Sequence, residues 1–411
     1  MSNPSATALA APGELERQLT RFINTTVLKG EGDVGPDTPL FEEGYINSLR
    51  ILDLIAFVEK ALGRRIPDRA VRLANFRTVA TIVRAFHPDA ATADSAVEPL
   101  PARFAHRTSR SRFTSPIDAL VERGDLTITG AGQVTLSGFA LDVSRAVDQT
   151  VTRWATALGA TERAFPSLID TAVLERAGQT QSFPQHLTLA SHPEPNGQPA
   201  DRTSVRHALA PAVCYHSYPD WAGKTLGEKP TLLTAVGRCY RYEGGHHVPL
   251  ERLWEFSMRE IVVLGSRDQV EHVRQALVER VSSLVTTLSL DGAIQPASDP
   301  FFTSGDEGRR LMQRAGALKY ELQLTVDASG RSVAVASFNH HHDYFGRRFA
   351  ITLPNADPAH SGCVAFGLER WVLALFAQHG AHEARWPEAA RRWIDDARSV
   401  GGRHGDERGR P

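Results

Sequence analysis

The chain has 411 residues, of which 42% are hydrophobic and 23% are charged, a composition typical of an ordinary folded protein. This length predicts two domains, and no apolar run approaches the ~20 residues that a membrane helix needs. The formal net charge of −1 argues against a nucleic-acid partner such as tRNA, because such proteins usually present a basic surface to phosphates. Three scattered cysteines exclude a disulfide framework, and the N-terminus has no signal-peptide pattern, so we expect a cytoplasmic protein.

Apolar residues at helical spacing predict a compact all-α unit at residues 13–87, after a disordered start at residues 1–12. A loop rich in glycine and proline separates the first two helices. The Ala/Pro/Asp-rich segment at residues 88–103 has no periodicity, and its composition predicts a linker. The three apolar stripes consist of Leu15, Leu19, Phe22 and Ile23, of Leu49, Leu52, Ile55, Val58 and Leu62, and of Val79, Ile82, Val83 and Phe86.

Ser48 stands where the Gly-rich loop meets the second predicted helix. A serine at this position is also common as a simple helix cap. The order of helix, long loop, serine, helix and short helix resembles an acyl carrier protein. In that family the serine of a Gly-x-Asp-Ser-Leu motif receives 4′-phosphopantetheine from a phosphopantetheinyl transferase, and the matching residues here are Gly44, Asn47, Ser48 and Leu49. Two residues separate Gly44 from Asn47 where one is usual, and asparagine replaces aspartate.

Residues 104–398 mix helical periodicity with strand-like runs joined by short turns. Because strands and helices do not strictly alternate, we predict an α+β domain with a largely antiparallel sheet flanked by helices. The polar, glycine-rich tail at residues 399–411 predicts disorder. The clearest predicted elements are a helix at Asp142–Leu158 and strands at Thr231–Tyr242, Glu260–Leu264, Tyr320–Val326 and Ser332–Phe338.

Two separated blocks carry the signature of ATP chemistry. The run from Gly237 to Glu243, a loop, and a second strand ending at Glu260 resemble motif 2 of class II aminoacyl-tRNA synthetases, with Arg241 and Glu243 as its Arg-x-Glu. A fixed guanidinium stabilises the negative charge that builds when a carboxylate attacks the α-phosphate of ATP. A later Gly-x-Glu-Arg that ends at Arg370 resembles motif 3, whose arginine contacts ATP. Each Arg–Glu pair also has a simpler interpretation as a surface ion pair.

Cys214 and Cys363 both fall in blocks around the proposed active site, and with Glu260 they form a Cys/Glu/Cys set. Two thiolates and one carboxylate leave a fourth position of Zn²⁺ open, and a substrate amine is a natural occupant. Cys239 is expected to be a small buried residue. Other candidate ligands are His246 and His247, and the run His340, His341 and His342 with Asp343. Consecutive histidines on a strand point to alternate faces, so we do not expect this run to converge on one ion.

This Cys/Glu/Cys trio matches the zinc ligands of atypical archaeal seryl-tRNA synthetases and of bacterial amino acid:[carrier protein] ligases, which residues 104–390 resemble. The ligases fit better, because a carrier-like unit replaces a tRNA-binding extension. The resemblance implies activation of a small amino acid, glycine or alanine, with ATP and Mg²⁺, transfer to its own or a separate carrier protein, and a homodimer. It also implies ATP contacts at Arg252, Leu253, Lys319, Ala334 and Ser337. The alternatives are an aminoacyl-tRNA synthetase with an appended carrier domain, and a non-catalytic scaffold that presents the carrier.

Overall fold

The computed structural model describes residues 12–28, 33–40, 50–64, 66, 73–87, 102–108, 113, 115–192, 205–297 and 319–402. These residues belong to two compact units, one formed by the N-terminal helices and one beginning at Ala102. Among the described residues, no helix is both long enough and apolar enough to cross a membrane. Ser48 and its neighbours Gly44, Asn47 and Leu49 lie outside the described residues.

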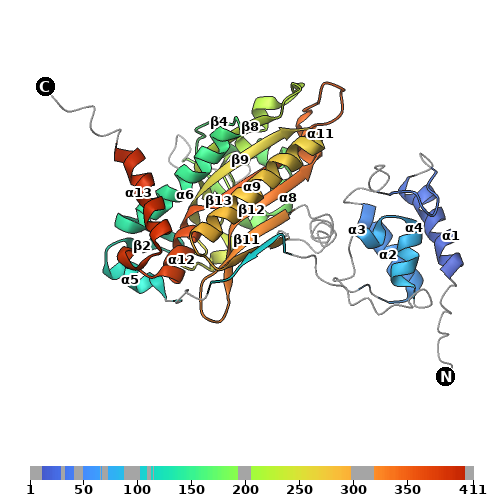
Figure 1. Ribbon diagram of the computed structural model, residues 1–411. Helices are drawn as coiled ribbons and strands as arrows, with labels where there is room; N and C mark the ends of the chain where they lie inside the picture. The colour runs from blue at the N-terminus through green and yellow to red at the C-terminus, as the bar shows by residue number, and fades with distance from the viewer. Residues whose placement is uncertain are drawn as a thin grey trace. The chain divides into compact units, whose positions relative to one another are not determined.

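The N-terminal unit is helical, as its three apolar stripes predict (Figure 1). Leu15, Leu19, Val58, Ile82 and Phe86 lie in one buried cluster, because each helix turns its apolar stripe toward the others. A capping box between Thr78 and Thr81 starts the last helix. The helices are α1 (Pro12–Phe22), which continues as a wider turn η1 (Ile23–Val27), α2 (Arg50–Leu62), α3 (Leu73–Phe76) and α4 (Val79–Phe86).

The larger unit is built on an eight-stranded sheet in the order β1-β10-β11-β12-β13-β9-β8-β4. The strands β11, β12, β13, β9 and β8 pair antiparallel with their neighbours, and only the two-residue strand β4 is shown to pair parallel among the described ladders. The predicted antiparallel α+β class is therefore correct. The strands of this sheet are β1 (Phe104–His106), β4 (Thr161–Glu162), β8 (Thr231–Tyr240), β9 (Glu255–Gly265), β10 (Gly292–Pro296), β11 (Lys319–Thr325), β12 (Ser332–His342) and β13 (His360–Gly367).

The long helices α6 (Gly138–Ala157), α9 (Arg267–Thr287) and α12 (Leu368–His379) lie along one face of this sheet (Figure 1). The helix α12 is buried almost all round, with Trp371 and Phe376 fully covered, which accounts for the apolar run predicted after motif 3. Side chains of β9 and β13 alternate between this helical face and the opposite face. The opposite face, which carries Glu260 and Cys363, holds the candidate site.

The remaining elements surround this framework. The helix α13 continues past Arg398, where the sequence predicts the domain to end. These elements are α5 (Pro116–Glu122), β2 (Leu126–Gly130), β3 (Gln133–Leu136), β5 (Leu168–Asp170), α7 (Thr171–Arg176), α8 (Gln179–Ser182), β6 (Thr188–Ala190), β7 (His207–Leu209), α11 (Tyr344–Phe349) and α13 (Glu388–Gly402).

Candidate active site

Cys214, Glu260 and Cys363 come together from three elements, and their potential ligand atoms all lie within 4.8 Å of one another. Cys214 begins the 3₁₀ turn η6 (Cys214–His216), Glu260 lies on β9, and Cys363 lies on the neighbouring strand β13. All three are buried, and Glu260 is only 1% exposed. Its Oε1 accepts a hydrogen bond of 2.8 Å from the backbone N–H of Val213, whereas its buried Oε2 has no hydrogen-bond donor at normal distance and angle among the described residues. A buried carboxylate oxygen without a hydrogen-bond donor is suited to bind a metal ion.

The electrostatics of the trio also suit a cation. Burial raises the pKa of Glu260 to about 8, even though the Val213 N–H and the charge of Arg241 oppose that rise. The hydrogen bond between the two thiols raises the pKa of Cys214 and lowers the pKa of Cys363, because the shared proton stays with Cys214. Three groups that each carry a negative charge when deprotonated are thus packed together in a buried site. A divalent cation would offset this concentration of charge.

Two further residues lie beside Cys363: Asn339, which sequence reasoning did not single out, and His341, which it considered only as part of the histidine run. The Asn339 side-chain amide lies 3.5 Å from the Cys363 sulfur, and His341 Nε2 lies 3.8 Å from it. Asn339 is paired directly with Cys363 across β12 and β13. The signal that finds them is the strand register, which a single sequence does not contain. These side chains are placed to orient the thiolate and to line the space around it.

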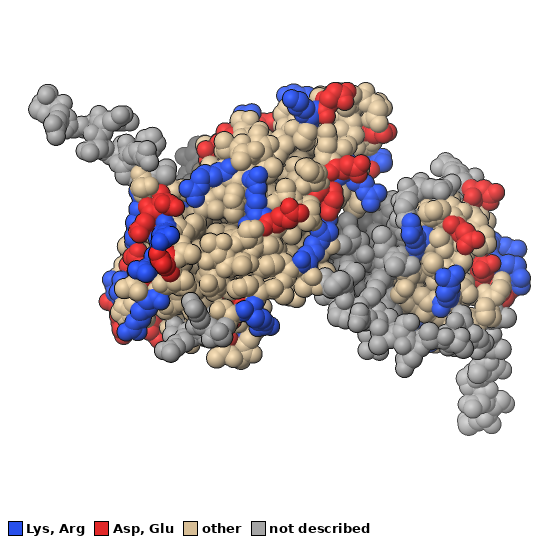
Figure 2. Space-filling model, viewed as in Figure 1, with Lys and Arg blue, Asp and Glu red and all other residues tan. Residues whose placement is uncertain are grey.

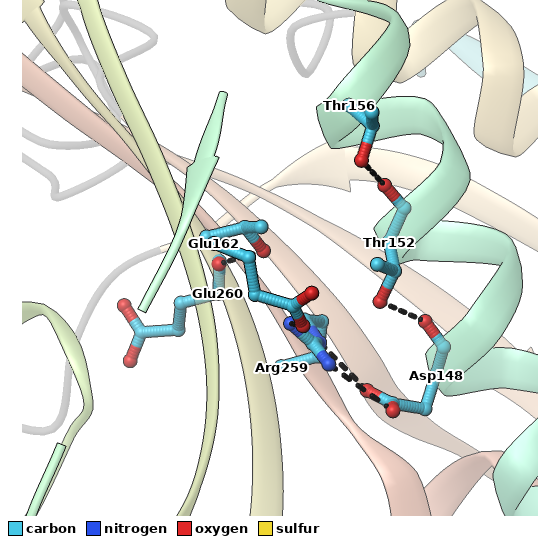
Figure 3. A network of polar contacts seen from close by, with 7 residues as sticks. Asp148, Thr152, Thr156, Glu162, Arg259 and Glu260 are labelled. Atoms are coloured by element: carbon cyan, nitrogen blue, oxygen red, sulfur yellow. Dashed lines mark hydrogen bonds and ion pairs between the residues drawn. The ribbon is translucent and has the colours of Figure 1, made fainter. Parts of the chain in front are cut away.

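Successive residues of β9 serve the two faces of the sheet. Figure 3 shows Glu260 pointing to one side of the strand while Arg259 points to the other, toward α6. Arg259 donates to both carboxylate oxygens of Asp148, at 2.6 and 3.2 Å, and to Glu162 at 2.9 Å. The side chain of Arg259 is 3% exposed, so this fork holds β9 against α6 from the buried side. Sequence reasoning did not single out Arg259.

The strand β8 ends at Tyr240, two residues before the predicted end at Tyr242, and Arg241 follows it directly. Its Nε–H donates to the carbonyl of Pro211 at 2.9 Å, and its guanidinium lies 5.4 Å from the centre of the Phe256 ring. Its backbone N–H donates to the carbonyl of Trp254, which closes the base of the motif 2 loop. The charge of Arg241 lowers the pKa of Glu260, so the guanidinium and the trio share one site. Glu243 begins the next 3₁₀ turn, and its side chain is outside the described part of the structure.

Arg370, near the start of α12, connects the motif 2 loop to the sheet. Its Nε–H donates to the carbonyl of Glu251 at 2.7 Å, and its Nη1 donates to the carbonyl of Ala334 at 3.0 Å. The preceding residue, Glu369, is buried, and both of its carboxylate oxygens accept from the N–H of Ser257 at 2.9 Å. The Glu369–Arg370 pair is therefore not a surface ion pair, and it fixes the start of α12 against β9.

The five residues with implied ATP contacts lie around the same strands. Lys319 is buried rather than solvated, and its Nζ lies 3.0 Å from a carboxylate oxygen of Glu321. Ser337 lies opposite Ala365 in the ladder of β12 and β13. Arg252 is exposed and forms backbone hydrogen bonds with Val248 in the motif 2 loop. The other two residues are Leu253, which is buried, and Ala334, whose carbonyl binds Arg370.

Within the described ranges, two groups of side chains have the geometry of a metal site: the Cys/Glu/Cys trio, and His340 with His342 and His360. Cys239 is fully buried, as expected, and takes part in neither group. The expectation that the histidine run does not converge is wrong for His340 and His342. Alternation separates His341 from its two neighbours, but residues two apart on a strand share a face.

The comparisons with known proteins agree with this geometry. The sequence model of the tRNA synthetase class II core domain (G, H, P, S and T) matches residues 201–379, and that of the phosphopantetheine attachment site matches residues 23–86. Amino acid–[acyl-carrier-protein] ligase 2 of Bradyrhizobium diazoefficiens is 34% identical over 245 residues, which cover 55% of this chain and 72% of that protein. Ligase 1 of the same organism is 33% identical over 248 residues, covering 55% and 74% respectively. The chain belongs to the amino acid–[acyl-carrier-protein] ligase family.

This ligase also has relatives among tRNA-charging enzymes. The type-2 serine–tRNA ligase of Methanopyrus kandleri is 30% identical over 203 residues, which cover 46% of this chain and 38% of that protein. The crystal structure of M. kandleri seryl-tRNA synthetase with Aquifex aeolicus tRNASec superposes with a TM-score of 0.63 at 23% identity, covering 85% of this chain and 70% of that one. The predicted class II synthetase fold of the larger unit and the helical carrier-type unit before it are thereby confirmed.

Proposed function

We propose that this ligase activates a small amino acid, with glycine and alanine as first candidates, and transfers it to a phosphopantetheine thiol on its own carrier unit at Ser48. The observation that carries this proposal is the buried Cys214/Glu260/Cys363 trio beside Arg241 on a class II synthetase sheet. The match to a phosphopantetheine attachment site in the same chain supports the acceptor. The names of the relatives support the overall reaction.

The trio fits a zinc ion through the chemistry of its donors. Two thiolates and a carboxylate are ligands that Zn²⁺ prefers, and the Glu260 Oε2 would be the third donor. Zinc bound by these three residues would keep a position for a neutral amine. We assign to Asn339 and His341 the task of orienting the Cys363 thiolate, since their nitrogen atoms lie 3.5 and 3.8 Å from its sulfur. A substrate whose amine bound there would have Arg241 nearby for its carboxylate, since the charge of Arg241 acts on Glu260.

The first half-reaction joins the substrate carboxylate to the α-phosphate of ATP, which is used with Mg²⁺, and releases pyrophosphate. Negative charge grows on the phosphate oxygens as the new P–O bond forms and the bond to pyrophosphate breaks. Arg241 is anchored through Nε by Pro211, so its terminal amino groups are the donors that we assign to the α-phosphate. Arg370 is held by two backbone carbonyls near the motif 2 loop, and we assign it to the outer phosphates. Glu243 is assigned to the adenine amino group.

In the second half-reaction the phosphopantetheine thiolate attacks the acyl carbon of the adenylate, and AMP leaves. The thioester forms while the mixed anhydride breaks, so no oxidant or further nucleotide is needed. A carrier joined by the linker at residues 88–103 gains an effective concentration on the order of mM. Modification of Ser48 by a phosphopantetheinyl transferase must come first.

Amino-acid-dependent exchange of pyrophosphate into ATP tests the activation step. With twenty amino acids tried separately, we expect exchange with a small amino acid, and a loss of at least ~100-fold in the Arg241→Ala and Arg370→Ala variants. The exposed Arg392 on α13, which pairs with Glu388, supplies a matched control, since Arg392→Ala should retain wild-type exchange. Absence of exchange with all twenty amino acids would refute activation and favour the carrier-presenting scaffold.

We also propose a homodimer, as in other class II enzymes, in which the carrier of one subunit is able to reach the partner's site. Mixing a Ser48→Ala chain with a Cys214→Ala chain tests this arrangement. Restored loading of the Cys214→Ala chain supports transfer across subunits. Failure to restore loading, with each parent variant folded and dimeric, restricts transfer to one chain.

Charging of tRNA is the second candidate, because serine–tRNA ligases are among the relatives. The face shown in Figure 2 carries lysine and arginine side chains interspersed with acidic ones rather than gathered into a basic patch. This face therefore offers no basic surface to a polyanion, and the net charge of −1 for the whole chain agrees with a protein acceptor. Incubation with ATP, the activated amino acid and total tRNA should give no acid-stable aminoacyl-tRNA, while the carrier in the same mixture becomes loaded.

A further inference from the structure

A cluster of three histidines, His340, His342 and His360, lies at one end of the sheet, where β12 ends and β13 begins. His340 pairs with Gly362, and His342 pairs with Ser361 after a bulge in the ladder. His341 points to the face of the trio, where its Nε2 lies near Cys363. His340 and His360 point to the other face, beneath the beginning of α9, since His340 Nδ1 lies 3.9 Å from Glu271 of that helix. The cluster is therefore separate from the candidate active site.

The nitrogen atoms of the cluster are spaced for metal binding. One ring nitrogen from each of His340, His342 and His360 lies within 4.8 Å of the other two. His340 Nε2 and His360 Nδ1 are 3.4 Å apart, which is long for an N–H···N hydrogen bond. Two imidazole nitrogens bound tetrahedrally to one zinc ion, at about 2.0–2.1 Å each, are about 3.3 Å apart. The observed separation matches that ligand–ligand edge.

The surroundings of the three rings suit a metal ion. All three rings are buried or partly buried, and a neutral imidazole offers one nitrogen lone pair to a metal ion. The buried His340 also has the second contact that metal-bound histidines usually have, because its Nδ1 faces the Glu271 carboxylate while Nε2 faces His360.

Packing of aromatic rings alone does not account for all of this geometry. The rings of His340 and His342 are stacked with centroids 4.7 Å apart, and the ring of His360 meets them at steep angles. Stacking alone does not require three ring nitrogens to converge, nor does it place two of them at 3.4 Å. His342 also takes a positive φ of 51°, a strained conformation for a residue other than glycine. Convergence of nitrogens at the end of a strand is what a shared ion explains.

We propose that His340, His342 and His360 bind a second divalent metal ion of the zinc type. Three neutral imidazoles suit a borderline ion such as Zn²⁺ and do not suit Mg²⁺ or Ca²⁺. The ion would tie the end of β12 to the start of β13 and so close the segment between them, which contains α11 and packs through Phe345 and Phe349 against Tyr218. Its role is structural, and it does not depend on the proposed zinc at the Cys/Glu/Cys trio.

Metal stoichiometry of the full chain separates the two sites. After equilibration with Zn²⁺ and removal of the excess, the wild type should hold about two zinc ions per chain. The Cys214→Ser/Cys363→Ser chain should keep about one ion, at the histidines, and the His340→Gln/His360→Gln chain should keep about one at the trio. The combined variant should hold none. Zinc retained by the histidine variant but absent from the folded cysteine variant would overturn the second site while leaving the first intact.

A second measurement uses the wild-type chain alone, so that a misfolded variant cannot obscure the result. Crystals of zinc-equilibrated protein, measured on both sides of the zinc absorption edge, should show an anomalous peak between the three imidazoles. Clear density for the three imidazoles without an anomalous peak between them contradicts the inference.

A third measurement uses Co²⁺ as a spectroscopic probe. In Co²⁺-loaded Cys214→Ser/Cys363→Ser protein, we expect visible ligand-field bands and no thiolate-to-cobalt charge transfer. The same chain carrying His342→Gln should lack the ligand-field bands.

Discussion

The buried ion pairs of Arg259 make the sharpest stability prediction. Arg259→Met keeps most of the apolar stem but removes the guanidinium that donates to Asp148 and Glu162. Loss of one partner from a fully buried pair costs about 3–5 kcal/mol. Here the carboxylates of Asp148 and Glu162 are 26% and 58% exposed, so water re-solvates them, and we reduce the expected loss to about 2–3 kcal/mol.

Urea unfolding followed by tryptophan fluorescence measures this change in the synthetase-like unit. All six tryptophans of the chain lie beyond residue 101, so their emission reports the synthetase-like unit and not the carrier unit. With an m-value of about 2–3 kcal/mol per molar urea, the midpoint of Arg259→Met should fall by about 1 M.

Arg398→Met is the matched control. Arg398 contacts three carboxylates where Arg259 contacts two, but its side chain is 36% exposed, and exposed pairs contribute about 0–1 kcal/mol. We therefore expect a midpoint shift no larger than about 0.5 M for the control. Equal shifts for the two variants, or no shift for Arg259→Met, would refute the reasoning that burial makes the ion pairs of Arg259 stabilising.

Two other changes test the sheet and its covering helices. Burial lowers the pKa of His379 to about 4, even though the hydrogen bond between its Nε2 and the Leu288 carbonyl opposes that fall. As the pH falls, the unfolded chain therefore takes up a proton near pH 6.5, before the folded chain does. Stability should therefore be full above about pH 6.5 and fall as the pH drops toward 4, and His379→Gln should flatten that part of the pH profile measured by urea unfolding. In Gly292→Ala the new methyl group would lie 2.5 Å from the Leu324 side chain and 2.7 Å from a backbone oxygen, which predicts a loss of about 1–3 kcal/mol. Gly227→Ala has nothing within 4 Å and should change the free energy of unfolding by less than about 0.5 kcal/mol, so equal losses would contradict the steric argument.

Much of the fold could be predicted from local patterns. The apolar spacing of Leu15 and Leu19, and of Ile82 and Phe86, predicts helices that the structure contains, because a helix buries one face whatever its partner is. The motif blocks around Arg241 and Arg370 gave the order of strand, loop, strand and helix. Element ends were less accurate: the pairing of β8 with β9 ends at Tyr240, and α13 continues to Gly402.

The parts of the site that sequence did not reveal depend on strand pairing. Asn339 reaches Cys363 only because β12 and β13 pair in one particular register. His360 is separated from His342 by a connection that includes α11, so no local pattern joins them. Arg259 looked like any charged residue of an amphipathic strand until α6 placed Asp148 opposite it. Long-range packing, rather than local propensity, produces each of these contacts.

The intact mass of the full chain, coexpressed with a phosphopantetheinyl transferase and then incubated with ATP and the small amino acid, tests the central proposal most directly. We expect the prosthetic group on Ser48, followed by a further gain equal to the aminoacyl group, which neutral hydroxylamine removes as expected for a thioester. Ser48→Ala should lack both additions, and Arg241→Ala should show the first without the second. A fully phosphopantetheinylated wild-type chain that gains no aminoacyl mass, while exchange of pyrophosphate proceeds, would contradict loading of its own carrier.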